Sequence, residues 1–410
     1  MVLERTIDPG EAGFDADRLA RIDSHFARYV DDGRLPGWQI VVTRRGQVVH
    51  SSTYGMRDRE AGRPVEADTL WRIYSMTKPI TAVAAMMLWE QGRLELTDEV
   101  SRFIPAFADM RVYSKGSALK PWTVPATEPV RIWHLLTHTS GLSYGFLHTS
   151  VVDELYRGRG SEWGGPPGLN LAQACDVWAE LPLLFQPGTA WGYSVATDVL
   201  GRVVEVVSGL ALDEFFTERI LQPLKMTDTR WWVGAEDAER LAALYTPDPA
   251  SGLARPLDAM SKVVLTPPDA LLGGGGLVST AADYHRFTQL LLRRGELDGV
   301  RLLGSRTVPW MTRNHLPGDG DLGRLSTGGF AETTFDGVGF GLGFAVLMDP
   351  RPSKVLSSPG EFFWGGAAST AFWVDPAEEI TAMLFAQLLP SSAYPLRPQL
   401  RQLIYSALVD

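Results

Sequence analysis

The stretch Ser75-Met-Thr-Lys78 stands at the head of a long apolar segment, and the interpretation of the whole chain starts from it. Residues 79–90 continue with a helical spacing of apolar side chains, and Gly92 ends that pattern. Residues three apart share one face of a helix, so the Lys78 amine should lie beside the Ser75 hydroxyl. A neighbouring base makes a serine hydroxyl nucleophilic, and a lysine can be that base. The stretch therefore predicts a serine nucleophile at a strand-to-helix junction. The simpler alternative is a serine that only caps the helix.

The same four-residue pattern occurs again in Ser117-Ala-Leu-Lys120, but its surroundings differ. Gly116 and Pro121 bracket this second copy, and no helical spacing of apolar residues follows it. Glycine and proline on both sides are typical of a surface loop, so we expect no chemistry there.

Composition limits the classes of protein to which the chain can belong. With 410 residues, of which 45% are hydrophobic, it can bury a large core, most simply in two lobes. A net charge of −10 without a basic cluster argues against nucleic acid or an anionic membrane as a partner. Cys175 is the only cysteine, which excludes intrachain disulfides and a thiolate metal cluster. The first residues lack a secretory-signal pattern and no apolar run has the length of a membrane span, so we expect a cytoplasmic protein.

Strand patterns lie near both ends of the chain, whereas helical patterns dominate its middle. Extended runs are predicted as a hairpin at 38–43 and 47–54 and as strands at 339–348, 368–374 and 380–386. Helices are predicted at 15–31, 131–138, 171–180, 197–208, 211–222, 281–294 and 395–408. This order predicts an α/β fold of the α+β type, in which both termini supply one sheet and a mainly helical lobe is inserted. We expect residues 1–95 and 260–410 to form the α/β domain and residues 96–259 the helical domain.

A serine nucleophile also needs a proton relay and donors for the oxyanion, and two later motifs can supply them. Tyr193 lies in Pro187-Gly-Thr-Ala-Trp-Gly-Tyr193, a loop that leads into a predicted helix, and a phenol beside a cationic lysine can pass protons. Trp364-Gly-Gly-Ala367 places two glycines before a strand, which lets a ligand approach the backbone. The backbone N–H groups of Ser75 and Ala367 would then form the oxyanion hole. Taken singly, Tyr193 could be a packing residue and the glycines an ordinary strand-edge turn.

These motifs follow one another along the chain as Ser75-Met-Thr-Lys78, Tyr193 after Pro-Gly-Thr, and Trp364-Gly-Gly. Together with Leu135-Leu-Thr-His-Thr-Ser-Gly-Leu and Gly339-Phe-Gly-Leu-Gly-Phe, the set resembles the serine β-lactamase and penicillin-binding protein superfamily over about residues 15–405. It is similar above all to class C β-lactamase-like carboxylesterases, also called family VIII esterases. The resemblance implies a β-lactamase/DD-peptidase-like fold, with an antiparallel sheet flanked by helices and an active site in the cleft between the two domains. It also implies that Ser75 is the nucleophile, that Lys78 activates it, and that Tyr193 acts first as base and then as acid toward the leaving group.

Two departures from the superfamily pattern bear on the substrate. Val195 stands where β-lactamases and peptidases carry the asparagine of Tyr-x-Asn, so a polar contact for an amide substrate is missing. Trp364-Gly-Gly falls where those proteins carry Lys-Thr-Gly or Lys-Ser-Gly, which replaces a cation for a substrate carboxylate by an apolar wall. Both departures favour neutral esters over anionic β-lactams or D-Ala peptides.

Three other patterns suggest different chemistry and are weaker. Gly141-Leu-Ser143-Tyr-Gly145 matches the G-x-S-x-G nucleophile elbow, but it follows a helix end instead of a strand, so we expect a turn. His134 and His138 have a zinc-ligand spacing without the glutamate of H-E-x-x-H, and we expect structural histidines. The four glycines at 273–276 lack the G-K-[ST] of a phosphate loop and predict close backbone packing.

The sequence thus predicts a serine carboxylesterase that hydrolyses small, neutral, short-chain esters through an acyl-enzyme on Ser75. The residues expected to line the substrate pocket are Trp364, Gly365, Gly366, Tyr144, Phe146, Trp191 and Phe362. No metal or organic cofactor is expected, and the oligomeric state is open. β-Lactamase, D-amino-acid peptidase or amidase, and acyltransferase activities are alternatives on the same site, because function resides in the site and not in the fold. More distant alternatives are a catalytically silent binding protein and a self-assembling protein.

Overall fold

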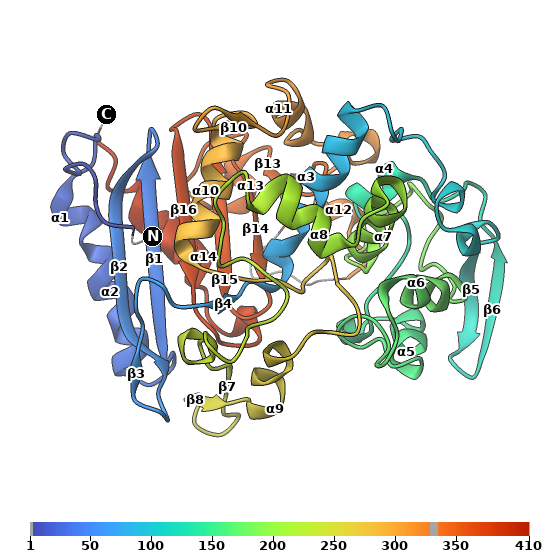
Figure 1. Ribbon diagram of the computed structural model, residues 1–410, viewed down its shortest axis with the longest axis horizontal. Coiled ribbons are helices and arrows are strands. Elements are labelled where there is room, and N and C mark those ends of the chain that lie inside the picture. Colours follow the sequence, from blue (N-terminus) through green and yellow to red (C-terminus); the bar gives the residue numbers. More distant parts are fainter. Residues whose placement is uncertain (1–2, 329–334, 410) are drawn as a thin grey trace.

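An antiparallel sheet of eight strands forms the centre of the structure, a computed structural model that describes residues 3–328 and 335–409 (Figure 1). The strand order across the sheet is β12-β13-β14-β15-β16-β1-β2-β3. The N-terminal part supplies β1 (Gly37–Arg44), β2 (Gln47–Asp58) and β3 (Arg63–Pro64). The C-terminal part supplies β12 (Val338–Phe340), β13 (Ala345–Leu347), β14 (Phe362–Gly366), β15 (Thr370–Asp375) and β16 (Ile380–Phe385). Both ends of the chain therefore build the sheet, as predicted, and β1 pairs with β16.

Alternate side chains of the sheet enter two separate hydrophobic layers, because successive residues of a strand point to opposite faces. In β16, Ile380, Ala382 and Leu384 enter one layer, and Met383 and Phe385 enter the other. The first layer is covered by α1, α2 and α14, and the second contains α3 and α10. Figure 1 shows α2 and α10 on opposite sides of the strands. The bounds of these helices are Ala16–Leu19 (α1), Arg21–Asp31 (α2), Thr77–Glu90 (α3), Ala281–Leu292 (α10) and Leu396–Tyr405 (α14).

Helices make up most of the middle of the chain and lie beside the sheet (Figure 1). They are α4 (Ile132–Leu136), α5 (Val151–Gly158), α6 (Leu171–Ala179), α7 (Ala196–Ser208) and α8 (Leu212–Phe216). Helix α7 packs against α3, so the two parts of the molecule share a core. The hairpin of β5 (Arg111–Ser117) and β6 (Lys120–Pro125) lies at the end of this region that is far from the sheet. Its turn holds the second Ser-x-x-Lys copy, and Leu119 there is fully exposed.

Short strands and helices connect the larger elements. The domain boundaries predicted at 95–96 and 259–260 stay predictions. The short strands are β4 (Trp71–Arg72), β7 (Tyr245–Pro247), β8 (Ala254–Pro256), β9 (Val278–Ser279), β10 (Glu296–Leu297) and β11 (Val300–Arg301). The short helices are α9 (Asp258–Ser261), α11 (Thr307–Met311), α12 (Leu322–Leu325) and α13 (Pro350–Ser353).

The structure differs from the predicted elements in several places, including the three that follow. The single strand predicted at 339–348 is two strands, β12 and β13, because the chain turns between them at Gly343, whose φ of 94° favours glycine. The glycines of Trp364-Gly-Gly were predicted to stand before a strand, but Gly365 and Gly366 are the last residues of β14 and pair with β15. The helix predicted at 211–222 is interrupted, since α8 continues as a π-helical turn at Thr217–Leu221.

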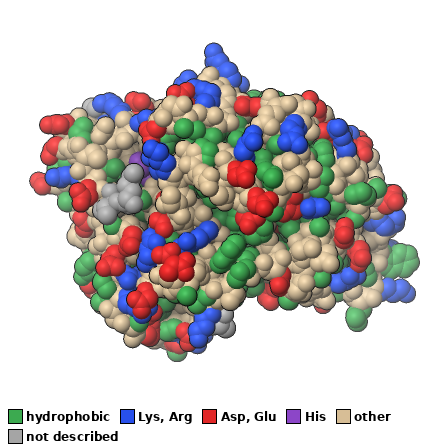
Figure 2. Space-filling model, viewed as in Figure 1, with side chains coloured by type: hydrophobic (Ala, Val, Ile, Leu, Met, Phe, Trp, Pro, Cys, Tyr) green, Lys and Arg blue, Asp and Glu red, His purple; other side chains and the backbone are tan. Residues whose placement is uncertain are grey.

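The surface agrees with the charge pattern of the sequence. Figure 2 shows Lys, Arg, Asp and Glu side chains interspersed over one face, without a large area of a single sign. Across residues 3–328 and 335–409, no helix combines the length and the apolar character that crossing a membrane would require.

Candidate active site

Ser75 lies in a single 3₁₀ turn, Tyr74–Met76, that joins β4 to α3. The turn is tight because Tyr74 adopts a left-handed φ of 43°, which is uncommon for a residue with a side chain. Two contacts hold it: the Met76 N–H donates to the Ile73 carbonyl at 3.0 Å, and the Tyr284 hydroxyl donates to the Met76 carbonyl at 2.9 Å. The strand-to-helix junction predicted for Ser75 is therefore present, with its conformation fixed from α10.

Lys78 and Tyr193 both reach Ser75. The Tyr193 hydroxyl oxygen is 2.5 Å from the Ser75 Oγ, and the Lys78 Nζ is 3.5 Å from it. The Lys78 ammonium also lies 4.6 Å from the centre of the Tyr193 ring, and both side chains are almost fully buried. Tyr193 comes from the loop before α7, whereas Lys78 belongs to the first turn of α3. The structure thus brings together three residues that the sequence predicted as one unit, across 118 positions of the chain.

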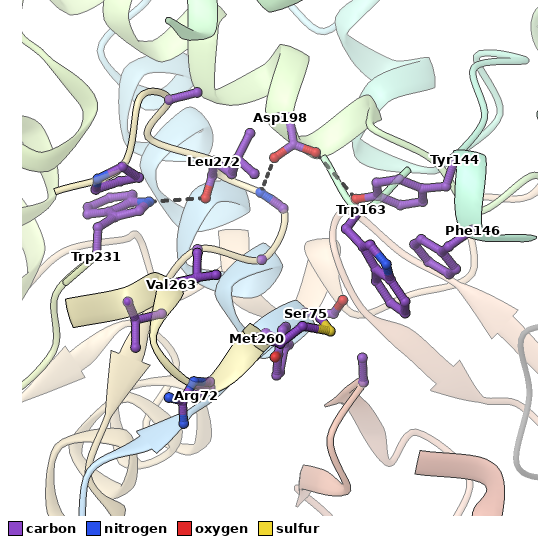
Figure 3. Close-up of a pocket in the computed structure, with 18 of the residues that line it drawn as sticks. Arg72, Ser75, Tyr144, Phe146, Trp163, Asp198, Trp231, Met260, Val263 and Leu272 are labelled. Atoms are coloured by element: carbon purple, nitrogen blue, oxygen red, sulfur yellow. Dashed lines mark hydrogen bonds between the residues drawn. The ribbon is translucent and has the colours of Figure 1, made fainter. Parts of the chain in front are cut away.

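A second polar group surrounds Lys78, and sequence reasoning missed most of it. Lys78 Nζ donates to the Tyr144 hydroxyl at 3.0 Å and to the Gly274 carbonyl at 2.6 Å. Tyr144 in turn donates to Asp198 Oδ2 at 3.3 Å, and the Gly274 N–H donates to Asp198 Oδ1 at 2.7 Å (Figure 3). Burial raises the pKa of the Asp198 carboxyl, and Lys78 counteracts that effect. Burial also raises the pKa of Tyr144, whose neighbouring Asp198 acts in the same direction.

Tyr144 was expected only as an aromatic wall, and Asp198 was not predicted at all. The signal available for Asp198 is its position, because it is an acidic residue in the first turn of α7, on a helix whose buried side chains are mostly apolar. A buried carboxylate needs hydrogen-bond partners, but the sequence does not say that Tyr144 and Gly274 supply them.

The tetraglycine segment packs closely against this polar group, as its composition predicted. A Cβ at Gly274 would lie 2.6 Å from Asp198 Oδ2 and 2.9 Å from the Tyr144 hydroxyl oxygen. A Cβ at Gly276 would lie 2.5 Å from the Trp231 ring. The absence of side chains therefore lets the backbone at 273–276 reach Lys78.

The strand that carries Trp364-Gly-Gly packs directly on the turn of Ser75. A Cβ at Gly366 would overlap the Ile73 carbonyl, so this position requires glycine for the close approach. Ala367 follows β14 and lines the same cavity as Ser75. The oxyanion hole formed by the N–H groups of these two residues stays a prediction that is compatible with this placement. Trp364 lies behind Tyr193, with ring centres 5.5 Å apart, and its indole is mostly buried.

A cavity of about 430 Å³ opens beside Ser75 (Figure 3). Of the residues predicted for the site, Ser75, Tyr144, Phe146, Tyr193 and Ala367 line it. The lining residues that the sequence did not indicate are Arg72, Tyr74, Trp163, Asp198, Trp231, Met260, Val263, Val264, Pro268, Ala270, Leu272, Gly274, Gly275 and Gly276. Trp163 stacks on Phe146 with ring centres 4.8 Å apart, and Phe146 stacks on Tyr144 at 4.9 Å, so aromatic rings form one continuous wall.

Other residues predicted to line the substrate pocket lie outside this cavity. Trp191 is fully buried behind Tyr193, where the two rings stack at 6.2 Å. Phe362 packs against Phe344 in the core beneath the sheet, at 5.3 Å. Trp364, Gly365 and Gly366 also lie outside the cavity lining: the indole packs on Tyr193, and a Cβ at Gly365 would overlap the Arg397 guanidinium. The position of an aromatic residue near a motif in the sequence does not indicate whether its side chain faces the cavity or the hydrophobic core.

The alternative motifs are structural. The Ser143 hydroxyl is buried and donates to Asp153 Oδ1 at 2.6 Å. His134 accepts a hydrogen bond from the Arg131 N–H at 3.1 Å at the start of α4, and burial lowers its pKa to about 4. Burial, followed by the charge of Lys78, lowers the pKa of His138, so it is neutral near pH 7. Within the part of the chain that the structure describes, no three His, Cys, Asp or Glu side chains are grouped as a metal site.

Comparison with known proteins identifies the family. The beta-lactamase family model matches residues 22–405, so the chain belongs to that family. Esterase EstB of Burkholderia gladioli is 34% identical over 418 residues, covering 98% of this chain and 99% of its own. Lovastatin esterase of Penicillium rubens is 30% identical over 370 residues, covering 86% of this chain and 89% of its own. The solved structure of EstCE1, described as a hydrolase with promiscuous acyltransferase activity, superimposes with a TM-score of 0.79 and 29% identity, covering 95% of this chain and 99% of its own.

The fold, the family and these relatives together define a serine hydrolase or acyltransferase of the β-lactamase fold, related to family VIII esterases. An arrangement in which a hydroxyl nucleophile, an amine and a phenol share hydrogen bonds beside a mainly apolar cavity can form and break an acyl-enzyme.

Proposed function

We propose that the protein is a carboxylesterase that forms an acyl-enzyme on Ser75 from small, neutral, short-chain esters. The observation that carries this proposal is the position of the Ser75 Oγ, 2.5 Å from the Tyr193 hydroxyl oxygen and 3.5 Å from the Lys78 Nζ, at the wall of a mainly apolar cavity. A hydroxyl so placed has a proton acceptor within hydrogen-bond reach and space for an ester in front of it.

The reaction proceeds in two steps on this geometry. The Ser75 Oγ attacks the ester carbonyl carbon while its proton moves to the Lys78–Tyr193 pair, and the N–H groups of Ser75 and Ala367 bind the oxyanion. The C–O bond to the alcohol then breaks, and the alcohol leaves with the proton that Ser75 had lost. Water, deprotonated by the same pair, attacks the acyl-enzyme and releases the acid.

Charge in the cavity supports a neutral substrate. In the sequence, Trp364 stands where β-lactamases carry a lysine; its indole packs on Tyr193 outside the cavity lining, so this position supplies no cation for a substrate carboxylate. Arg72 lines the cavity, but its guanidinium donates to the carbonyls of Ala242 and Ser261, and burial lowers its pKa to about 10. Both terminal nitrogens of the Arg72 guanidinium are thus held by protein acceptors and its Nε is buried, which leaves little of the group for a substrate carboxylate.

Acyl transfer to an added alcohol is the second candidate activity. The apolar lining favours it, because an alcohol that partitions into such a cavity competes with water for the acyl-enzyme. The promiscuous acyltransferase activity named for EstCE1 supports the same expectation.

The test is hydrolysis of a short-chain aryl ester by the wild type and by Ser75→Ala and Ser143→Ala, with a chromogenic cephalosporin assayed in parallel. We expect Ser75→Ala to lose turnover by at least about 10³-fold and Ser143→Ala to keep most of it. Circular dichroism verifies that each variant folds, and mass spectrometry should locate a phosphonate adduct on the peptide that contains Ser75. Turnover that survives Ser75→Ala, or a cephalosporin rate equal to the ester rate, would refute the proposal.

A further inference from the structure

The hairpin of β5 and β6 exposes apolar and basic side chains at its turn. Leu119 is 100% exposed, and Trp122 is 57% exposed. Lys115 lies opposite Trp122 across the strand pair, with its Nζ 5.4 Å from the centre of the indole, and Lys120 is the first residue of β6. These four residues are called the hairpin tip below. In Figure 2, hydrophobic and basic side chains protrude at the end of the molecule where Figure 1 places this hairpin.

A groove of about 560 Å³ lies at the other end of the hairpin, where β5 begins and β6 ends. Its lining includes three exposed carboxylates, those of Glu99, Asp109 and Glu128. Apolar side chains, among them Phe107 and Met110, form much of the remaining lining. This site is called the acidic groove below. It offers an apolar floor between negative charges, which matches a ligand that is both apolar and basic.

Two arginines beside the acidic groove do not cancel its charge. Arg111 lines the groove, but its guanidinium donates to oxygens of β6 at 2.7 and 3.0 Å. Arg131 pairs with Glu128 at 3.6 Å. The carboxylates of Glu99 and Asp109 therefore keep the groove negative, whereas two lysines make the hairpin tip positive. Tip and groove are thus complementary in charge.

A hairpin cannot place its tip in the acidic groove of the same molecule. The groove adjoins the Arg111–Pro125 pair of the hairpin, and the turn follows the Ser117–Lys120 pair. At about 3.3 Å per residue, the extended β5 holds these two places roughly 20 Å apart. Two copies whose hairpins lie side by side in opposite directions about a twofold axis bring each tip to the groove of the other. The two contacts are then identical, and the assembly closes as a dimer.

The composition of β6 favours contact through side chains over strand addition. Pro121 and Pro125 remove two N–H groups from this strand. Proline on an edge strand hinders pairing with another chain. The hairpin is a sheet of two strands, joined to the body by the bridge between Val112 and Leu183. A second copy would therefore contact the side chains of the tip and would not extend this sheet.

From these observations we infer that the protein forms a twofold symmetric homodimer in which the hairpin tip of each copy binds the acidic groove of the other. The hairpin and the groove together comprise about two dozen residues, which agrees with the roughly 20–30 residues that each side of a standard interface contributes. Tryptophan is a residue type that often dominates the binding energy of an interface, and Trp122 supplies one at the tip. The inference goes beyond the proposed esterase activity and does not depend on it.

The first test is the mass of the protein in solution. Light scattering and sedimentation velocity at about 1 to 100 µM should show the 45.0 kDa chain converting to a species of about 90 kDa. Trp122→Ser should raise the Kd of the dimer at least about 10-fold, because an aromatic anchor is lost. Leu356→Ser is the matched control and should leave the Kd unchanged, since Leu356 is 55% exposed and lies outside the hairpin and the groove. Circular dichroism verifies that each variant folds.

Two charge-reversed chains test the reciprocal arrangement itself. One carries Lys115→Glu and Lys120→Glu in the tip, and the other carries Asp109→Lys and Glu128→Lys in the groove. Each chain alone should have a Kd at least about 100-fold higher than the wild type, because its tip and groove have charges of the same sign. Mixed in equal amounts, the two chains should form a heterodimer, since both of its contacts join opposite charges.

Several results would overturn the inference. One is a wild type that stays near 45.0 kDa at every concentration, which would leave its tip free for a different acidic protein. Another is a dimer that Trp122→Ser does not weaken, or a wild type that forms assemblies larger than a dimer. Charge-reversed chains that do not associate when mixed would also overturn it.

Discussion

Gly366 offers a direct test of how the sheet positions the oxyanion donors. It is the last residue of β14, immediately before Ala367, and a Cβ at this position would overlap the carbonyl oxygen of Ile73. That carbonyl accepts the Met76 N–H at 3.0 Å, which closes the turn that carries Ser75. Gly366→Ala therefore forces apart the two segments whose N–H groups we assign to the oxyanion hole.

The size of the effect follows from the overlap. A methyl group cannot approach a backbone oxygen so closely, so β14 or the Ser75 turn must shift by roughly 0.5–1 Å, at a cost of about 1–3 kcal/mol in stability. The Ala367 N–H would then lie outside the narrow range in which it can stabilise the oxyanion. Loss of one such donor lowers kcat by about 10²–10³-fold, and we expect the lower end of that range. KM should change much less, because the donor acts mainly in the transition state.

The assay combines aryl-ester kinetics with urea unfolding of the wild type, Gly366→Ala and Gly158→Ala. Gly158 ends α5, and a Cβ there would meet no atom within 4 Å, so this control should keep wild-type kcat. A Gly366→Ala variant with wild-type kcat and wild-type stability would refute the reasoning. A variant that loses stability but keeps kcat would show that the strand packs on the turn without placing a donor.

Two further perturbations probe the cavity mouth and the partly buried His134. Trp163 is 46% exposed and stacks on Phe146, so it should contribute to the binding of bulky esters. Trp163→Ala should lower kcat/KM about 10-fold for a naphthyl ester and little for an acetate. Equal losses for both esters would contradict this role. His134 has a pKa of about 4 in the folded chain against 6.5 when unfolded, so its contribution to stability is complete above pH 6.5 and is lost as the pH falls toward 4. The free energy of unfolding, measured by urea titration, should therefore fall less between pH 7.5 and pH 4.5 in His134→Gln than in the wild type, by at most about 3 kcal/mol. An equal fall in both proteins would exclude His134 as the origin of the pH dependence.

The sequence predicted best those features that a short stretch of chain determines. Ser75 and Lys78 lie three residues apart on one turn of structure, so their proximity follows from helical spacing. Strands from both termini were also predictable, because their apolar alternation is strong. Tyr193 required the order of several motifs, since nothing local says that its loop reaches Ser75.

Features that depend on packing between distant segments were not predictable. Asp198 and Tyr144 are 54 positions apart, and only the fold shows that they share a hydrogen bond over Lys78. Trp191 and Phe362 looked equivalent to Phe146 in the sequence, but the direction in which each side chain points decides whether it reaches the cavity or the core. Gly365 and Gly366 have low strand propensity, and pairing with β15 places them in a strand nonetheless.

The pairing of β1 with β16 has a consequence for how the chain is made. The Thr43 and Thr381 hydroxyl oxygens are 2.6 Å apart across this pair, although 338 positions separate the two residues. At about 5–20 residues per second, a ribosome needs roughly 20–70 s to extend the chain from the first strand to its partner. During that time the edge of β1 that faces β16 has no partner and can pair with other chains. Phe14 and Leu408 are bridged in the folded protein, so a permuted chain joined near them would have β16 and β1 synthesised one after the other.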